Sequence, residues 1–390
     1  MLTSSGSSAG PNAGRAAHAG PPLRARLPAN AGWRPQHRRD HISVALCVPL
    51  GGTAGIWGPS ALASARLAVS ELNRGAGIGG RPCRLLTVNA ADDAPDIEAT
   101  LAELIDAGEI DAMIGMHTSG VRQRMLRAVG GQLPFIYTPL YEGGEDTPGV
   151  FAIGETTERQ LQPALAWLAR HRAPQRWLAV GNDYVWPRVA HRLAQPHIAA
   201  HGAALVAQTY LPFGTTDYSE VLDQIRRSRA DAVLVSLIGQ DAVAFNRAFG
   251  RAGLSRHVLR LSCALGENEL LGIGVDNSDE LYVACGYFAS LDTDANLAFT
   301  ERYHQHFGER APTLSTFGQS TYEGVHFLAA LFDEAAQAAD TGWDRLGRAP
   351  LRYRSARSDA ESGQTRLGQQ QAPIYLARAE DNVFRVLTRP

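Results

Sequence analysis

The 390-residue chain contains no lysine, so all 37 of its basic residues are arginines. They are balanced by 39 acidic residues, and the formal net charge of -2 provides no basic field for nucleic acid or for an anionic membrane surface. The sequence also lacks any run of about 18 apolar residues, the length that a membrane-spanning helix needs. We therefore expect neither direct nucleic-acid binding nor membrane insertion.

Cysteine is scarce as well. The four cysteines, Cys47, Cys83, Cys263 and Cys285, lie far apart and show no CxxC or Cys/His ligand spacing. We expect them to be small core residues, although a pair would be able to form a disulfide in an exported protein. No metal or other cofactor is predicted.

The N-terminal stretch is rich in Gly, Ala, Ser, Pro and Arg. It contains no apolar segment of the roughly 7 to 15 residues that a secretory signal requires. We therefore predict a disordered tail over residues 1–40 and a cytoplasmic protein. The alternative is a periplasmic protein whose N-terminus is misassigned.

From residue 42 onward, short apolar runs alternate with longer amphipathic ones, as in α/β proteins whose parallel sheets are covered by helices. The 45% hydrophobic content agrees with sizeable cores. Two such blocks, 42–154 and 155–285, predict two similar lobes, followed by two helices and a last pair of strands. The predicted strands begin at Ile42, Arg84, Asp111, Pro134, Arg176, Ala204, Asp231, Glu280, Ile374 and Val383.

Polar residues follow a predicted strand of the first block. The strand that begins at Asp111 ends in MHTSG, where Ser119 is a predicted N-cap of the next helix. Its hydroxyl and the neighbouring N–H groups suit a carbonyl oxygen or an anion, although capping alone explains the serine equally well. His117 is a candidate polar contact, and a structural role is the commoner one for a lone histidine.

The stretch GNDYVWPR places two aromatic residues at a strand end of the second block. Because ligands of open α/β sheets bind beyond the carboxyl ends of the strands, Tyr184 and Trp186 are expected to face Ser119 across a cleft. Flat rings enclose a small ligand at low entropic cost. Core packing is the competing explanation for both rings, and helix capping is the competing explanation for Asp183 as a ligand contact.

Motifs of enzymes are missing. The sequence has no GxSxG, HExxH or GK[ST] loop, and GAGIGG ends a helix and precedes a strand, the reverse of the context that dinucleotide binding needs. Glu142, Glu145 and Asp183 form an acid and base pair only if the fold brings them together. We expect no enzyme, and a hydrolase is kept as a third hypothesis.

Several longer motifs resemble one family. They include AVSELNRGAGIGGRP, IGMHTSGVR, YTPLYEGGEDTPGVFAIG, VGNDYVWPR, CGYFASLDTDANLAF and STYEGVHFLAAL. Together they resemble type I periplasmic-binding-fold proteins of the amide and urea group, which includes the amide sensor of amidase operons, formamide-binding proteins and urea receptors. The resemblance runs from about Ile42 to Val386.

The resemblance implies two Rossmann-like lobes with parallel sheets, joined by a three-crossover hinge. Lobe 1 is then formed by residues 41–154 and 286–340, and lobe 2 by residues 155–285 and 341–390. A small neutral amide or urea-like solute is expected to bind between them without chemistry.

The resemblance also implies a set of ligand contacts. Ser119, with Tyr137 and Thr138 near it, matches the hydroxyl side of the site, and Tyr184 and Trp186 match its opposing aromatics. His117 occupies a position where relatives often carry an aromatic. Ser262 and Cys263 are candidates from the second lobe, in the stretch SCALGENE.

Two functions share this fold. The first is an amide sensor that signals to a regulator protein by closing on its ligand. The alternative is the receptor of an ABC importer for urea, short amides or branched-chain amino acids, with the permease as partner. Association into a homo-oligomer is left open.

Overall fold

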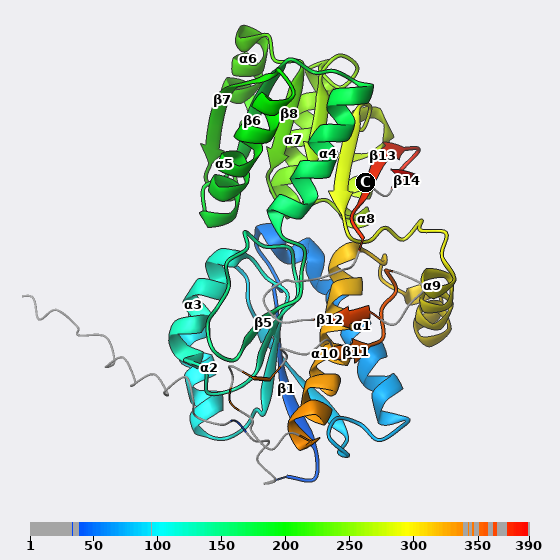
Figure 1. The fold of residues 1–390 in the computed structure, drawn as a ribbon. Coiled ribbons are helices and arrows are strands. Elements are labelled where there is room, and N and C mark those ends of the chain that lie inside the picture. The colour runs from blue at the N-terminus through cyan, green and yellow to red at the C-terminus, as the bar shows by residue number, and fades with distance from the viewer. Residues whose placement is uncertain are drawn as a thin grey trace, which may run out of the picture.

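The computed structural model describes residues 33, 39–94, 96–337, 342, 345–346, 351–357, 362–364 and 373–388. They form two α/β lobes, with lobe 1 in the lower half of Figure 1 and lobe 2 in the upper half. The predicted fold class is confirmed.

Lobe 1 contains a five-stranded parallel sheet of order β2-β1-β3-β4-β5. Strand β1, which lies between β2 and β3, is buried on both faces: Val44 and Leu46 contribute to one core, and Ala45 and Cys47 to the other. This double burial explains why the strand is a continuous apolar run rather than an alternating one. The strands are β1 (Ile42–Val48), β2 (Cys83–Asn89), β3 (Ala112–Gly115), β4 (Phe135–Tyr137) and β5 (Val150–Ala152).

Helices cover both faces of this sheet. α1 and α10 pack against each other on one face, and α2 and α3 pack on the other (Figure 1). The helices of lobe 1 are η1 (Thr53–Trp57), α1 (Gly58–Asn73), α2 (Ile97–Asp106), α3 (Ser119–Val129), α9 (Asp294–Phe307), η3 (Gly308–Arg310) and α10 (Thr316–Gln337).

Lobe 2 is built on a seven-stranded sheet of order β14-β13-β10-β9-β8-β6-β7, in which β13 and β14 are antiparallel additions. The strands are β6 (Arg176–Asn182), β7 (Ala204–Leu211), β8 (Ala232–Ser236), β9 (Leu259–Ser262), β10 (Leu281–Cys285), β13 (Tyr375–Glu380) and β14 (Val383–Thr388). α4 packs against α5, and α7 packs against α8. The helices are α4 (Thr157–His171), α5 (Val185–Ala200), α6 (Ser219–Ser228), α7 (Gly239–Arg251), α8 (Glu267–Ile273) and η2 (Val275–Asn277).

The chain passes between the lobes after β5, after β10 and after β12. The last passage differs from the predicted boundary at residue 340, because β11 (Leu351–Tyr353) packs on α10 of lobe 1 and pairs with β12 (Ser362–Gln364). The return to lobe 2 is complete at β13, which pairs with β10. Residues 351–357 therefore belong to lobe 1.

A buried ion-pair cluster, formed by Arg357, Glu155 and Glu323, joins segments from the passages. Arg357 Nη1 donates to Glu155 Oε1 at 2.5 Å, and the same guanidinium pairs with Glu323 of α10. Gly286, at the start of the second passage, lies against this cluster: a Cβ there would be 2.0 Å from Glu155 Oε1. The cluster thus ties the first passage, through Glu155, and the segment after β11, through Arg357, to Glu323 of α10.

Most of the predicted tail over residues 1–40 lies outside the described residues. Of those described, Trp33 packs edge-on against Phe332 of α10, with ring centroids 4.9 Å apart. Arg39 pairs with Asp111 at 3.2 Å. These two residues are therefore part of lobe 1 rather than of a disordered tail.

The four cysteines are buried and free, as predicted for core residues. Within the described part of the chain, no helix combines the length and the apolar character needed to cross a membrane.

Candidate functional site

A small cavity lies between the lobes, where loops that follow strands of both sheets meet. Its volume is about 10 Å³, which is about the room that one water needs. Five of the eight predicted site residues line it: His117, Ser119, Tyr137, Tyr184 and Trp186. The other lining residues are Trp57, Thr118, Pro139, Leu140, Ile238, Ala264 and Phe317.

The first turn of α3 presents hydroxyl groups to this cavity. Thr118, not the predicted Ser119, is the N-cap: its side chain accepts a hydrogen bond from the N–H of Val121. Ser119 is the first helical residue, and its Oγ donates to Glu142 Oε2 at 2.6 Å. Glu142 is held in turn by Arg122, whose Nη2 donates to Oε1 at 2.5 Å. Ser119 is therefore positioned by an ion pair rather than by a cap.

Tyr137 and His117 line the cavity from lobe 1. The Tyr137 hydroxyl donates to the carbonyl of His117 at 2.8 Å, and the two rings lie 5.3 Å apart. Burial lowers the pKa of His117 to about 3, so the imidazole is neutral. Its Nδ1 lies 3.1 Å from the carbonyl oxygen of Thr118, which makes Nδ1 the protonated nitrogen and leaves a lone pair on Nε2.

Lobe 2 contributes the two aromatic residues that the sequence singled out. Trp186 is buried in the first turn of α5, and its Nε1 donates to Thr157 Oγ1 of α4 at 2.9 Å. Tyr184 precedes α5 and lies against α3 of lobe 1: a methyl group at Gly120 would be 3.9 Å from its Cδ2. Burial raises the pKa of Tyr184 well above its ordinary value, so the phenol stays protonated.

Trp57 and Phe317 are lining residues that the sequence analysis missed. Their rings stack with centroids 4.3 Å apart. The Trp57 Nε1 donates to Glu269 Oε1 of lobe 2 at 2.6 Å, so the hydrogen bond between Trp57 and Glu269 joins the two lobes. Burial raises the pKa of Glu269 to about 7. Trp57 follows β1 in a strand-end loop, and the rule that found Tyr184 also applies to it.

Three predicted residues lie outside the lining. Thr138 follows Tyr137 in an extended segment and so points to the opposite face, where a Cβ at Gly324 of α10 would meet its methyl group at 2.4 Å. Ser262 Oγ accepts from the N–H of Ala264, and Cys263 is buried with its carbonyl bound to Gln160 Nε2. The next residue, Ala264, is the one that lines the cavity.

Asp183, which was considered as a ligand contact or a helix cap, lies outside the cavity lining and is not the N-cap of α5. It is half exposed and pairs with Arg188 at 2.6 Å, while Tyr184 occupies the N-cap position of α5. No group of three or more His, Cys, Asp or Glu side chains in the described part of the chain is arranged to hold a metal ion.

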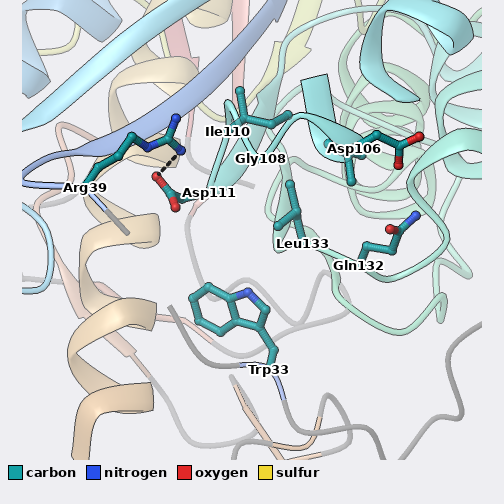
Figure 2. A pocket seen from close by; sticks show the side chains of 9 residues that line it. Trp33, Arg39, Asp106, Gly108, Ile110, Asp111, Gln132 and Leu133 are labelled. Carbon is teal, nitrogen blue, oxygen red and sulfur yellow. Dashed lines mark hydrogen bonds and ion pairs between the residues drawn. The ribbon is translucent and has the colours of Figure 1, made fainter. Parts of the chain in front are cut away.

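A larger cavity, of about 160 Å³, lies at the other end of lobe 1 (Figure 2). The pair formed by Arg39 and Asp111 lies on one side of it, Asp106 and Gln132 lie on another, and the Trp33 ring closes its base. It contains none of the predicted site residues.

The architecture and the cavity between the lobes define the class: a two-lobed protein with the type I periplasmic-binding fold. The model of the periplasmic binding protein family matches residues 41–382, and the chain belongs to this family. Its members are binding proteins rather than enzymes.

Solved structures share the fold at low sequence identity. One is a solute-binding protein of an ABC transporter from Rhodopseudomonas palustris in complex with p-hydroxybenzoic acid, with a TM-score of 0.78 and 18% identity over 90% of this chain and 96% of that one. Another is the branched-chain amino acid transporter substrate-binding protein LivJ from Streptococcus pneumoniae in complex with isoleucine, with a TM-score of 0.74 and 17% identity over 89% and 99% of the two chains. A periplasmic binding protein from Burkholderia mallei aligns with a TM-score of 0.75 and 15% identity over 90% and 94% of the chains.

The family membership corrects the predicted location. The cytoplasmic prediction depended on residues 1–40 lacking a recognisable secretory signal, and it is wrong because the matched family is periplasmic. The periplasmic alternative is the one that the comparisons support.

Proposed function

We propose that this protein is the solute-binding component of an ABC importer, and that its solute is a small uncharged amide or urea-like molecule. The observation that carries the proposal is the composition of the cavity wall. Rings, hydroxyls and aliphatic groups line it, and no Asp, Glu or Arg is among the described lining residues. An amino acid or a benzoate would bring charge into this site without a side chain of opposite charge to meet it.

The cavity is too small, at about 10 Å³, for any organic solute in this arrangement of the lobes, since it has the room of about one water. Binding therefore requires the lining side chains or the lobes to move apart, and a solute of few atoms requires the least displacement. An amide of about four heavy atoms gains at most roughly 6 kcal/mol, which corresponds to a Kd on the order of tens of micromolar.

The importer function is preferred to the sensor function. The chain belongs to the periplasmic binding protein family, and several solved structures of the same fold are described as ABC-transporter solute-binding proteins. The proposed partner is therefore a permease rather than a regulator. Deleting the gene should abolish uptake of labelled urea or acetamide from micromolar concentrations, and undiminished uptake would contradict the importer function.

Thermal unfolding with candidate ligands tests the solute class. At a hundredfold excess over Kd, a ligand that binds only the native state adds about 2.7 kcal/mol of stability. We expect millimolar acetamide or urea to raise the Tm by a few degrees, and Tyr184→Ala or Trp186→Ala to abolish the rise. Asp183→Ala, a change in the same loop at a half-exposed residue, is the control and should keep it. A Tm rise with isoleucine or p-hydroxybenzoate, and none with the amides, would overturn the proposed solute.

A further inference from the structure

Three of the hydroxyl groups that line the cavity already donate their protons to other groups of the protein. Ser119 donates to Glu142 at 2.6 Å, Thr118 donates to Asp92 Oδ1 at 2.5 Å, and Tyr137 donates to the His117 carbonyl at 2.8 Å. A hydroxyl carries one proton and two lone pairs, so each oxygen has only acceptor capacity left. Ser119 and Tyr137 therefore offer lone pairs to a guest.

The ring N–H groups of the lining are committed in the same way. The Trp57 N–H donates a hydrogen bond to Glu269 at 2.6 Å, and the Trp186 N–H donates one to Thr157 at 2.9 Å. The His117 Nδ1–H goes to the carbonyl of Thr118, and the buried Nε2 has no hydrogen-bond partner. These side chains add no donor to the cavity. The Nε2 of His117 lies beside Gly115 of β3, where a Cβ would meet it at 2.5 Å.

Tyr184 is the exception. Its side chain lines the cavity, and no hydrogen bond ties its hydroxyl to another described residue. Its phenol proton is therefore free for one carbonyl oxygen of a guest. The site thus combines one side-chain donor from lobe 2 with acceptors from lobe 1.

We infer that the site selects solutes by hydrogen-bond polarity: it takes a molecule with one carbonyl oxygen and several N–H donors, and Glu142 sets this preference by binding the Ser119 proton. The inference rests on the proposed function and sharpens it, because it ranks urea above simple amides and excludes carboxylates. The carboxylates of Asp92 and Glu142, both bound to hydroxyls of the α3 N-terminus, further disfavour an anion there.

The role of Glu142 follows from its two contacts. Arg122 holds Oε1 at 2.5 Å, so Oε2 is fixed toward Ser119 as an acceptor. In Glu142→Gln, the amide keeps an oxygen for Arg122 and turns an N–H group toward Ser119. The Ser119 proton is then released toward the cavity, and the serine changes from an acceptor to a donor.

Four planar molecules of the same size test the inference: urea with two amino groups, acetamide with one, acetone with none, and acetate with none and a charge. In calorimetric titrations of the wild-type protein, we expect urea to bind about tenfold more tightly than acetamide, since a hydrogen bond is worth roughly that factor. Acetone and acetate should show no detectable binding. Glu142→Gln should weaken urea binding about tenfold and make acetate or acetone binding detectable.

The control is Glu98→Gln. Glu98 of α2 pairs with Arg124 on the outer part of α3, so this change should leave the ranking of the four molecules unchanged. Ser119→Ala removes the lone pairs and the proton together, and should abolish the preference for urea over acetamide even if Glu142→Gln does not fold. Equal binding of urea and acetamide, or binding of acetone as tight as that of acetamide, overturns the polarity inference while the proposed function stands. An unchanged ranking in Glu142→Gln overturns the role of Glu142. If neither urea nor acetamide binds, the proposed function itself fails.

Discussion

Trp57 lines the cavity and also joins the two lobes through Glu269. Its indole N–H is bound to a buried carboxyl group whose pKa burial raises to about 7. The residue is therefore part of both the cavity wall and a contact between the lobes. Trp57 ends η1, the element that follows β1, much as Tyr184 and Trp186 lie at the start of α5, the element that follows β6.

We expect Trp57→Phe to destabilise the protein by about 1–3 kcal/mol, because the ring and its stacking on Phe317 are kept while a buried carboxyl oxygen loses its donor. Calorimetric unfolding of the variant measures the loss. Adding Glu269→Gln to Trp57→Phe should recover part of it, because the buried group that lost its donor is then neutral, while an acceptor is kept for the Gly266 N–H. If the double variant is less stable than Trp57→Phe, the assigned cause is wrong.

At the scale of single residues, residue type and position at the end of a strand were sufficient to predict part of the site. The aromatic pair Tyr184 and Trp186 and the serine at the start of α3 were predicted to face one cavity, and the structure places them there, although their contact with a ligand stays a prediction. Glu142 was considered only as a catalytic carboxylate, because its contact with Ser119 depends on how the loop after β4 folds. Phe317 is the second residue of α10, which follows α9 and η3 rather than a strand, and no local pattern marks it.

Among the elements, η1 connects the two lobes by packing. It lies in lobe 1, yet it packs on α7 and α8 of lobe 2. Gly239, the first residue of α7, has a φ of +49°, and a Cβ there would lie 2.0 Å from the carbonyl oxygen of Thr53. Only glycine permits this approach.

Gly239→Ala should therefore hinder closure while both lobes still fold. We expect the affinity for the solute to fall at least about tenfold, since closure must then displace η1. Small-angle scattering in saturating solute should show a larger radius of gyration than in the wild type. Gly253→Ala is the matched control: this glycine follows α7, also has a positive φ, and has no atom within 4 Å of the place that the added methyl group would occupy. Equal effects of the two changes would assign the result to backbone strain alone.

The buried ion-pair cluster of Arg357, Glu155 and Glu323 gives a second prediction at the scale of elements. Arg357→Met should cost about 3–5 kcal/mol, because Glu155 and Glu323 would remain buried without a cation. The Tm should fall accordingly. Combining it with Glu155→Gln and Glu323→Gln removes both buried charges and should restore much of the loss, and a triple variant as unstable as the single one would contradict this account.

Most strands were predicted from apolar runs. Four were missed, β5, β9, β11 and β12, and for the first two the cause is specific. β5 has three residues, too few for a pattern to show. β9 contains Arg260, which is fully buried because it donates to Asn246 Oδ1 at 2.6 Å and lies over the Phe249 ring at 4.5 Å. An arginine in a short strand is not recognised as a core residue from the sequence, because its burial depends on partners from other elements.

For the whole molecule, the two-lobed architecture was predictable because each lobe repeats a local alternation of strand and helix. The lobe assignment of β11 was not, since only contacts with α10 decide it. The location was mispredicted because it depended on the absence of a signal, and family membership is the stronger observation.

The stability of the molecule should depend on pH through Glu267 and Glu269. Burial raises the pKa of each from the ordinary 4.5 to about 7. Between these values the unfolded chain releases protons that the folded protein keeps, so the contribution of these two carboxyl groups to the free energy of unfolding falls as pH rises from about 4.5 to about 7 and then levels off. Buried His117 and His191, whose pKa values are lowered to about 3 and about 4, contribute the opposite slope up to about pH 6.5, so the difference between the wild type and a carboxyl variant is the informative quantity. Tm values from calorimetry at about pH 5 and above about pH 7.5 measure the difference. The double variant Glu267→Gln and Glu269→Gln should lose most of this slope, and a slope equal to that of the wild type would refute the assignment.

The interleaved path of the chain also bears on its biosynthesis. Residues 157–285 supply an unbroken set of strands and helices, whereas α1 must wait for α10, which emerges from the ribosome much later. Domains usually acquire structure in the order of translation. Here the middle of the polypeptide is able to fold first, and the nascent N-terminal half stays incomplete, and open to chaperones, until α10 has been made.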